Sequence, residues 1–286
     1  MPKLLPAAMF LSFLIATPAL AQDQSDKPPE TPTTADQDGD SLMIGVGIGA
    51  VPSYEGSNDT ALSIVPGIRG RVSRINFELA GNRFTADLIP TKGGPGWDLQ
   101  LGPVAQLNFN RVFTIIDPQV KRLGKRDVAV EVGGYVGIGK QGVITSDYDK
   151  LSVSVIYAHD IAGSHKSYAI TPSINYGTPL SRKAFVNLAF AADYMGEGYA
   201  RTYFSVDAAG SAASGLPVFN AHKGWKDWTV AAIGNVSLTG DLTHGLSLLG
   251  LVSYRRMLGD AAATPITSIA GSPNQLMGVL GVAYTF

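Results

Sequence analysis

The chain of 286 residues contains no cysteine and carries little charge for its length. Without cysteine it can form neither disulfide bridges nor thiolate metal sites. Charged residues make up 16% of the sequence, whereas an ordinary soluble domain has roughly a quarter. After the first twenty positions the sequence also lacks any apolar run of about 18 residues, the length that a helical membrane span needs. A membrane protein without such spans has one alternative, a closed β-barrel, because lipid cannot satisfy free backbone N–H and C=O groups.

The motifs of common metal and cofactor sites are lacking too. The four histidines, at positions 159, 165, 222 and 244, show no compact metal-ligand spacing. A loop metal site built from His159, Asp160 and His165 is conceivable, but we interpret this segment as a solvated loop. The glycines at 45, 47 and 49 lack the following helix and the later glycine of a dinucleotide fingerprint. They are better explained as the lumen-facing side of a first strand, so we predict neither metal nor cofactor.

Catalysis has no clear signature in the sequence. No G-x-S-x-G elbow and no Walker A loop occurs. An acyl hydrolase would need a nucleophile beside a base, and the nearest hint is His159 with Ser152 and Ser154. Alternation along a strand puts neither serine on the face of His159. We therefore predict that the protein is not an enzyme. The net charge of -1 also gives no support for a nucleic-acid partner.

The N-terminus has the pattern of an export signal. Lys3 supplies a positive charge, and residues 4–16 form an apolar segment of signal-peptide length. Ala19 and Ala21 fit the small-x-small cleavage pattern, so we expect the mature chain to begin at Gln22. An uncleaved anchor is the competing interpretation, but the run is short for a span. We divide the chain into a signal peptide (1–21), a polar, disordered periplasmic leader (22–40) and a barrel (41–286).

From Ser41 onward, segments of alternating apolar and polar residues recur between turn signals. They predict an all-β fold, a transmembrane antiparallel β-barrel of about twelve strands with apolar residues outside and polar residues inside. Two hairpins, near positions 70–73 and 81–83, are so tight that the strands beside them are hard to count. Ten and fourteen strands therefore remain as alternative counts. The same alternation would also fit a soluble β-sandwich. The interleaved polar residues give a candidate lumen-lining set: Arg74, Asn76, Glu78, Asp98, Gln100, Asn108 and Glu131.

The lengths of the connections support the barrel. With the C-terminus in the periplasm, the long connections at 195–227 and 259–274 lie outside, and the short ones at 179–182 and 239–244 lie inside. Barrels of the outer-membrane type have this asymmetry. Seven aromatic residues fall at or beyond the predicted outer rim, where they would form an interfacial girdle or bind a ligand: Tyr54, Tyr194, Tyr199, Tyr203, Phe204, Trp225 and Trp228.

The last twelve residues, 275–286, alternate and end on an aromatic residue. An outer-membrane barrel commonly ends in such a strand, which closes the sheet and faces lipid. We therefore assign Tyr284 and Phe286 to membrane assembly.

Several segments together resemble the MipA/OmpV family, the MltA-interacting proteins of the Gram-negative outer membrane. The resemblance covers residues 42–286, and its motifs include 52–59 (PSYEGSND), 203–206 (YFSV), 224–227 (GWKD), 254–260 (YRRMLGD) and 281–286 (GVAYTF). It implies an outer-membrane barrel with a scaffold role that links murein hydrolase and synthase.

The leading hypothesis is thus an envelope scaffold in the cell outer membrane. Its expected partners are outer-membrane lipid, the barrel assembly machinery and murein (peptidoglycan) hydrolase or synthase proteins. Two alternatives remain: a small-solute channel or ligand-binding barrel, suggested by the charged inner faces, and a surface adhesin that uses the loop at 195–227.

Overall fold

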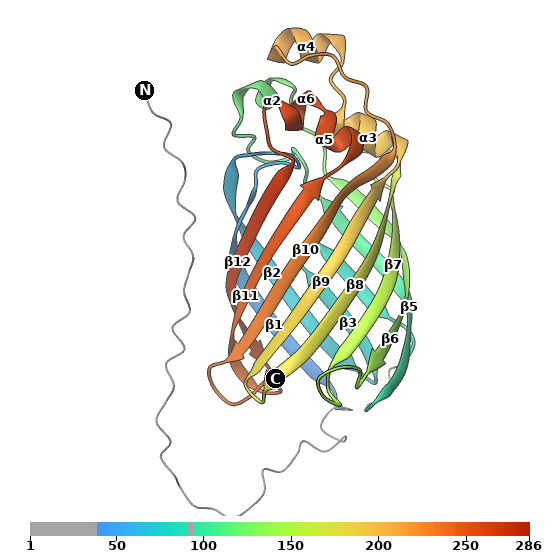
Figure 1. Ribbon diagram of the computed structural model, residues 1–286, viewed down its shortest axis with the longest axis vertical. Coiled ribbons are helices and arrows are strands. Elements are labelled where there is room, and N and C mark those ends of the chain that lie inside the picture. Colours follow the sequence, from blue (N-terminus) through green and yellow to red (C-terminus); the bar gives the residue numbers. More distant parts are fainter. Residues whose placement is uncertain (1–38, 91–93) are drawn as a thin grey trace, which may run out of the picture.

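A computed structural model describes residues 39–90 and 94–286 as a closed antiparallel barrel of twelve strands (Figure 1). Each strand pairs with its neighbours in the chain, and β1 also pairs with β12. The expected number of twelve is therefore confirmed, and both tight hairpins are real. The strands are β1 (Ser41–Pro52), β2 (Thr60–Val72), β3 (Ile75–Ala80), β4 (Arg83–Asp87), β5 (Gly96–Asn108), β6 (Ala129–Gln141), β7 (Lys150–Asp160), β8 (Tyr168–Ser181), β9 (Ala184–Met195), β10 (Gly224–Ser237), β11 (Gly245–Met257) and β12 (Asn274–Thr285).

The two faces of the wall follow the alternation of the sequence. In β1, Ile48 is exposed on the outside, while its neighbours Gly47 and Gly49 are buried on the inside. Glycine is required at 47 because a Cβ atom there would lie 2.9 Å from Val279 Cγ1 on β12. Large apolar side chains cover the outer surface; Leu280, for example, is 71% exposed. Such a surface suits lipid and excludes the alternative of a soluble sandwich, which would bury these residues between two sheets.

Strand β12 closes the barrel. Its Thr285 is the register partner of Met43 on β1 and of Gly245 on β11. The Phe286 N–H donates to the Leu42 carbonyl at 2.9 Å, so pairing continues to the last residue. The rings of Tyr284 and Phe286 lie 4.8 Å apart. The predicted closing strand is therefore confirmed, whereas the role of these two rings in assembly stays a prediction.

One end of the barrel has short turns and the other carries helices (Figure 1). The helices are α2 (Pro118–Arg122), α3 (Glu197–Phe204), α4 (Ala208–Ser214), α5 (Gly259–Ala263) and α6 (Pro265–Ser268). No helix in the described part of the chain is long and apolar enough to cross a membrane. We call the helical end the outer end, following the asymmetry of connection lengths. The sequence pattern indicates only loops in these segments, so the helices are an addition to the predicted fold.

The helices and their connecting loops form a cap with a hydrophobic core. One cluster of buried side chains joins Tyr199, Tyr203 and Phe204 of α3 to Met257 at the end of β11. A second joins Tyr54 to residues around α2, α4 and α6. The girdle interpretation was therefore wrong for four of the seven rim aromatics, Tyr54, Tyr199, Tyr203 and Phe204, which are at most 3% exposed. The remaining three lie on strands and contact one another or neighbouring rings: Tyr194, Trp225 and Trp228.

Candidate functional site: a buried charge network beneath the cap

A β-bulge brings two consecutive charged residues into the barrel. The register between β9 and β10 shifts between Trp225 and Asp227, so Lys226 is the extra residue. A bulge re-aims a side chain that regular alternation would place on the other face. Lys226 and Asp227 are both buried as a result, while Trp225 remains exposed on the outside.

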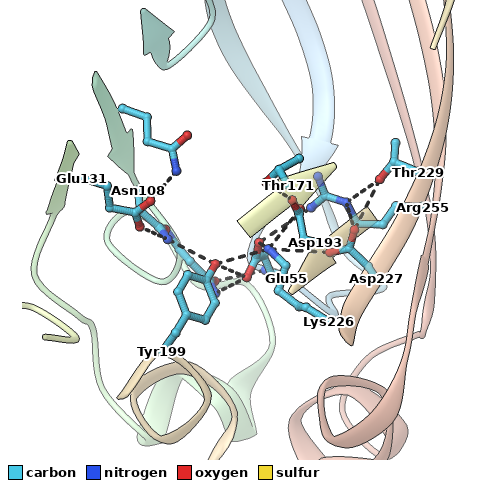
Figure 2. A network of polar contacts seen from close by, with 12 residues as sticks. Glu55, Asn108, Glu131, Thr171, Asp193, Tyr199, Lys226, Asp227, Thr229 and Arg255 are labelled. Atoms are coloured by element: carbon cyan, nitrogen blue, oxygen red, sulfur yellow. Dashed lines mark hydrogen bonds and ion pairs between the residues drawn. The ribbon is translucent and has the colours of Figure 1, made fainter. Parts of the chain in front are cut away.

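Lys226 is the centre of the network (Figure 2). Its Nζ lies 2.7 Å from Glu55 Oε1 and 3.6 Å from one carboxylate oxygen each of Asp193 and Asp227. The same ammonium group lies 5.1 Å from the centre of the Tyr199 ring. A buried ammonium group loses its hydration, so it is stable only when carboxylates of this kind surround it.

Arg255 on β11 completes the charged core. Its Nε is 3.6 Å from Asp227 Oδ1, and its Nη1 is 3.7 Å from Glu55 Oε1. Nε also donates to the Thr229 hydroxyl at 3.2 Å. Three carboxylates therefore face two cations, which leaves one formal negative charge. The Thr171 hydroxyl shares part of that charge by donating to Asp193 Oδ1 at 2.5 Å.

Tyr199 links this core to a second buried carboxylate. Its hydroxyl donates to Glu55 Oε2 at 2.9 Å and accepts from Asn108 Nδ2 at 3.2 Å. Asn108 also donates to Glu131 Oε1 at 3.2 Å, and His165 Nε2 lies 3.0 Å from the same oxygen. Burial and the nearby Glu55 charge raise the pKa of the Tyr199 hydroxyl far above its usual range, so this hydroxyl remains a donor.

Glu55 belongs to the 53–59 loop, which is held on both sides. Asn110 Nδ2 donates to Glu55 Oε2 at 3.0 Å, and the Glu55 N–H donates back to Asn110 Oδ1 at 3.1 Å. Gly56 has a φ of 92°, and a Cβ atom on it would lie 2.3 Å from Thr267 Oγ1 of α6. The loop is thus clamped between the cap and the charged core.

The network joins the wall to the cap. Its residues come from β5, β6, β8, β9, β10, β11, α3 and the 53–59 loop. Its ionic groups pair with one another, and two hydroxyls, those of Tyr199 and Thr171, donate to its carboxylates. In the described ranges, no three His, Cys, Asp or Glu side chains are grouped to hold a metal ion. The arrangement is therefore that of a clasp, in which each ion holds its neighbours.

A smaller group of hydrogen bonds, centred on Asp149, stabilises a turn at the opposite end of the barrel. Asp149 is fully buried and accepts from the N–H groups of Val143 (2.6 Å), Ile144 (2.8 Å) and Thr145 (2.6 Å), and from the Tyr176 hydroxyl (2.8 Å). Desolvation raises the pKa of this carboxyl, but the hydrogen bonds outweigh it and hold the pKa well below the usual range. The turn at 142–149 is consequently a rigid surface at the inner end.

The predicted lumen-lining residues have different positions. On the inner face, Asp98 pairs with Lys150 at 2.5 Å and accepts from Gln100 at 3.1 Å. Asn76 and Glu78 lie on the inner face of β3. Asn108 and Glu131 belong to the buried network rather than to a free lumen surface. Arg74 lies in the turn before β3, with a φ of 67°, and is not part of a strand. The signal residues Ala19, Ala21 and Gln22 lie outside the described residues.

Sequence reasoning missed most of the charged core: Glu55, Asp193, Lys226, Asp227 and Arg255. The segment Trp225–Trp228 held a usable signal, since two adjacent charges between two tryptophans interrupt the alternation. The solvated-loop interpretation was wrong for His165, whose side chain is fully buried against Glu131. It is covered by α3, as the 5.0 Å between the His165 and Tyr199 rings shows.

Solved structures similar to this chain are bacterial barrels, but the similarity is weak. The outer membrane channel DcaP of Acinetobacter baumannii has a TM-score of 0.38 and 11% identity, over 87% of this chain and 96% of that one. The toluene transporter TbuX of Ralstonia pickettii has a TM-score of 0.37 and 10% identity, over 90% of this chain and 92% of that one. At these values nothing about function follows. No individual curated protein matches the sequence at a significant level.

The family assignment rests on the sequence itself. A family described as MltA-interacting protein MipA matches residues 44–286, which span the barrel from β1 to the last residue. The match includes every strand and the whole cap. The architecture and this match together identify an outer-membrane barrel protein, and the chain belongs to the MipA family.

Proposed function

We propose that this protein is a non-catalytic scaffold of the outer membrane that presents its periplasmic end to a murein hydrolase. The observation that carries this proposal is the helical cap at the outer end, which its hydrophobic core and the charge network hold onto the wall. A barrel capped in this way is suited to anchoring and presenting surfaces rather than to passing solutes. The family description adds the class of partner, because it names an interaction with MltA.

The inner end offers a rigid docking surface. Its turns are short, and the 142–149 turn is organised around the buried Asp149 carboxylate. Ile144 in this turn is 68% exposed, and Leu180 beside the 182–183 turn is also 68% exposed. Exposed apolar side chains on a rigid polar turn are typical of the centre of a protein interface.

Binding of purified MltA to the full-length protein in detergent or nanodiscs tests the proposal. We expect Ile144→Asp to weaken binding at least tenfold, since it places a charge in the contact. Val218→Asp is the matched control, because Val218 is 56% exposed in the cap at the opposite end. Loss of binding in both variants, or in neither, would contradict docking at the inner end. A deletion variant that lacks residues 22–40 measures the contribution of the leader.

Planar bilayers distinguish the scaffold from the channel. The scaffold predicts a quiet bilayer without discrete conductance steps, because the cap covers the outer end. Reproducible single-channel steps from the intact protein would overturn this part of the proposal.

Export with cleavage after Ala21 belongs to the same proposal. Its support is the apolar segment at 4–16 followed by the small residues Ala19 and Ala21. N-terminal sequencing of protein isolated from outer membranes should begin at Gln22. A sequence that begins at Met1 would show a retained anchor.

A further inference from the structure

The wall is incomplete between β2 and β5. Strand β2 pairs with β1 along its whole length, from Thr60 to Arg71. On its other side it pairs with β3 only from Gly67 to Val72, because the β3–β4 hairpin is short. The outer half of β2, residues 60–65, therefore has a free edge toward β5.

The parity of the strand identifies the backbone groups on this edge. The Gly81 N–H donates to the Pro66 carbonyl at 2.9 Å, so even-numbered residues of β2 point their N–H and C=O groups toward β3. Within the described ranges, Leu62 and Ile64 have no backbone partner there, and only the Ser63 hydroxyl contacts the Ile64 carbonyl, at 3.5 Å. Pro66 lacks an N–H group, which suits the residue where pairing stops.

The free edge adjoins the apolar outer surface of the barrel. Leu62 is 80% exposed and Ile64 74% exposed, and both point outward beside the apolar side chains of β1. Unpaired backbone groups do not face hydrocarbon, where each costs several kcal/mol. Water or a polar group must therefore reach this edge through the wall.

Apolar rings border the gap on the side of β5. The Leu107 N–H donates to the carbonyl of Asn82, in the turn between β3 and β4, at 3.0 Å. Strand β5 therefore stops pairing with the β3–β4 hairpin near its own last residue. Immediately afterwards, the rings of Phe109 and Phe113 lie 5.3 Å apart, and both are exposed. Above them, the hydrogen bonds between Asn110 and Glu55 join this segment to the 53–59 loop.

The inner face is accessible at this position. Four inward-facing residues form an exposed strip that runs from the free edge toward the inner end: Ser63, Ala80, Glu78 and Arg69. Among the other inward-facing strand residues that the structure describes, only Gly133 and residues at strand ends are exposed. The strip is therefore a local feature beside the gap rather than a property of the whole lumen.

The charges near the strip favour an anion. Inward-facing residues of β2, β3 and β4 include three arginines, Arg69, Arg71 and Arg83, and two carboxylates, Glu78 and Asp87. On the strip itself, Arg69 is the exposed cation, and its register partner on β3 is Glu78.

A hollow on the outer surface adjoins the same strand. It is a shallow, open apolar region of about 670 Å³. Leu62 and Ile48 form one side, and Gly234, Gly250 and Gly278 of three successive strands form its floor. It has the apolar lining that an acyl chain requires.

We propose that the gap between β2 and β5 is a lateral opening for a single-chain amphiphile with an anionic head group, of the fatty-acid type. The head group moves along the strip and contacts Arg69, while the tail leaves the lumen between Ile64 and the Phe109–Phe113 pair. The tail then lies against the apolar outer surface beside Leu62. This route is compatible with the capped outer end, because it leads sideways into the membrane.

Single-cysteine labelling tests the opening, since the chain has no cysteine of its own. We expect a maleimide attached to a lipid acyl chain to label Ser63→Cys at a rate within about threefold of the outward-facing Leu62→Cys. The matched control is Ser173→Cys, which points inward from β8, has register partners on both sides (Ser154 on β7 and Ala191 on β9) and should react at least tenfold more slowly. Equal rates for Ser63→Cys and Ser173→Cys would show a closed wall and overturn the proposal. A heat-dependent gel shift confirms that each variant is folded.

Photolabelling tests the ligand. A sixteen-carbon fatty acid with a diazirine at its tail should crosslink to peptides that contain residues 60–66 or 109–113. Excess palmitate should compete, whereas hexadecane should not, and Arg69→Gln should reduce labelling severalfold. Labelling spread evenly around the barrel, or unchanged in Arg69→Gln, would refute the site. A photoreactive amino acid placed at Leu62 that captured a polypeptide instead of a lipid would assign the edge to a partner strand and also refute the proposal. Neither result depends on MltA binding.

Discussion

Lys226 Nζ on β10 lies 2.7 Å from Glu55 Oε1 in the first outer loop, although 171 positions separate the two residues in the chain. This contact joins the wall to the loop beneath the cap. Both side chains are largely removed from water, being 8% and 17% exposed. Such a pair contributes little when it is intact, but the loss of one partner leaves the other charge buried and uncompensated.

Lys226→Ala should therefore destabilise the folded barrel strongly. The substitution leaves Glu55, Asp193 and Asp227 close together without the central ammonium group, so we expect a loss of about 3–5 kcal/mol in the free energy of unfolding. Urea unfolding in detergent micelles measures it. The control is Lys223→Ala on the exposed loop, which should change the free energy by less than about 0.5 kcal/mol. If Lys226→Ala lowered the free energy of unfolding as little as the control, the charge network would not be what stabilises the contact between wall and loop.

Gly56→Ala should loosen the cap. The left-handed φ of 92° disfavours any side chain, and the new Cβ atom would collide with Thr267 Oγ1 at 2.3 Å. Left-handed strain costs about 1–2 kcal/mol for a non-glycine residue, and displacement of α6 adds to that cost. Limited proteolysis of the outer end should become several times faster. Gly224→Ala serves as the control, because a Cβ atom there meets nothing within 4 Å, and faster cleavage in both variants would refute this explanation.

Asp149 should make the inner turn sensitive to acid. The pKa of this carboxyl is lowered in the folded protein, so its stabilising contribution is complete above the unfolded value of about 3.9. The contribution is lost as the pH falls from there toward the lower folded pKa. The stability difference between the wild type and Asp149→Asn should therefore be constant from pH 7 to pH 5 and shrink below pH 4. Unfolding curves across this range test the prediction, with the exposed Asp147→Asn as control; a difference that grows toward low pH would contradict it.

Deletion of Phe286 should reduce assembly more than stability. Its ring is 62% exposed and lies 4.8 Å from the Tyr284 ring, whereas its N–H group extends the pairing to Leu42. We expect less folded protein in outer membranes, measured by heat-dependent gel mobility, and near-normal levels for Phe286→Tyr. Normal levels of the shortened chain would show that Phe286 is not needed for assembly.

The wall could be predicted from the sequence because each strand shows its two faces locally. Ile44, Val46 and Ile48 alternate with glycines, and that period alone places them outside. The cap could not be predicted in the same way. Its helices have four to eight residues and are too short to be stable alone, so they depend on tertiary packing such as the buried cluster that includes Tyr199 and Met257.

The charge network was hidden for a different reason. Alternation assigns Asp193, Asp227 and Arg255 to the inside but gives no sign that they meet, since this depends on the register of three strands, β9, β10 and β11. Lys226 enters the barrel only through a bulge, which changes the parity of the strand. The free edge of β2 was equally invisible, because it arises from the unequal lengths of β2 and β3.

The double pairing of β12 sets the order of events during biogenesis. Until the final dozen residues have been exported, both β1 and β11 lack a partner on one side. Exposed strand edges recruit other chains and promote aggregation. A growing copy of this protein must accordingly be kept from folding in the periplasm until its synthesis is complete, and a chain truncated anywhere before β12 becomes a substrate for proteolysis rather than a smaller barrel.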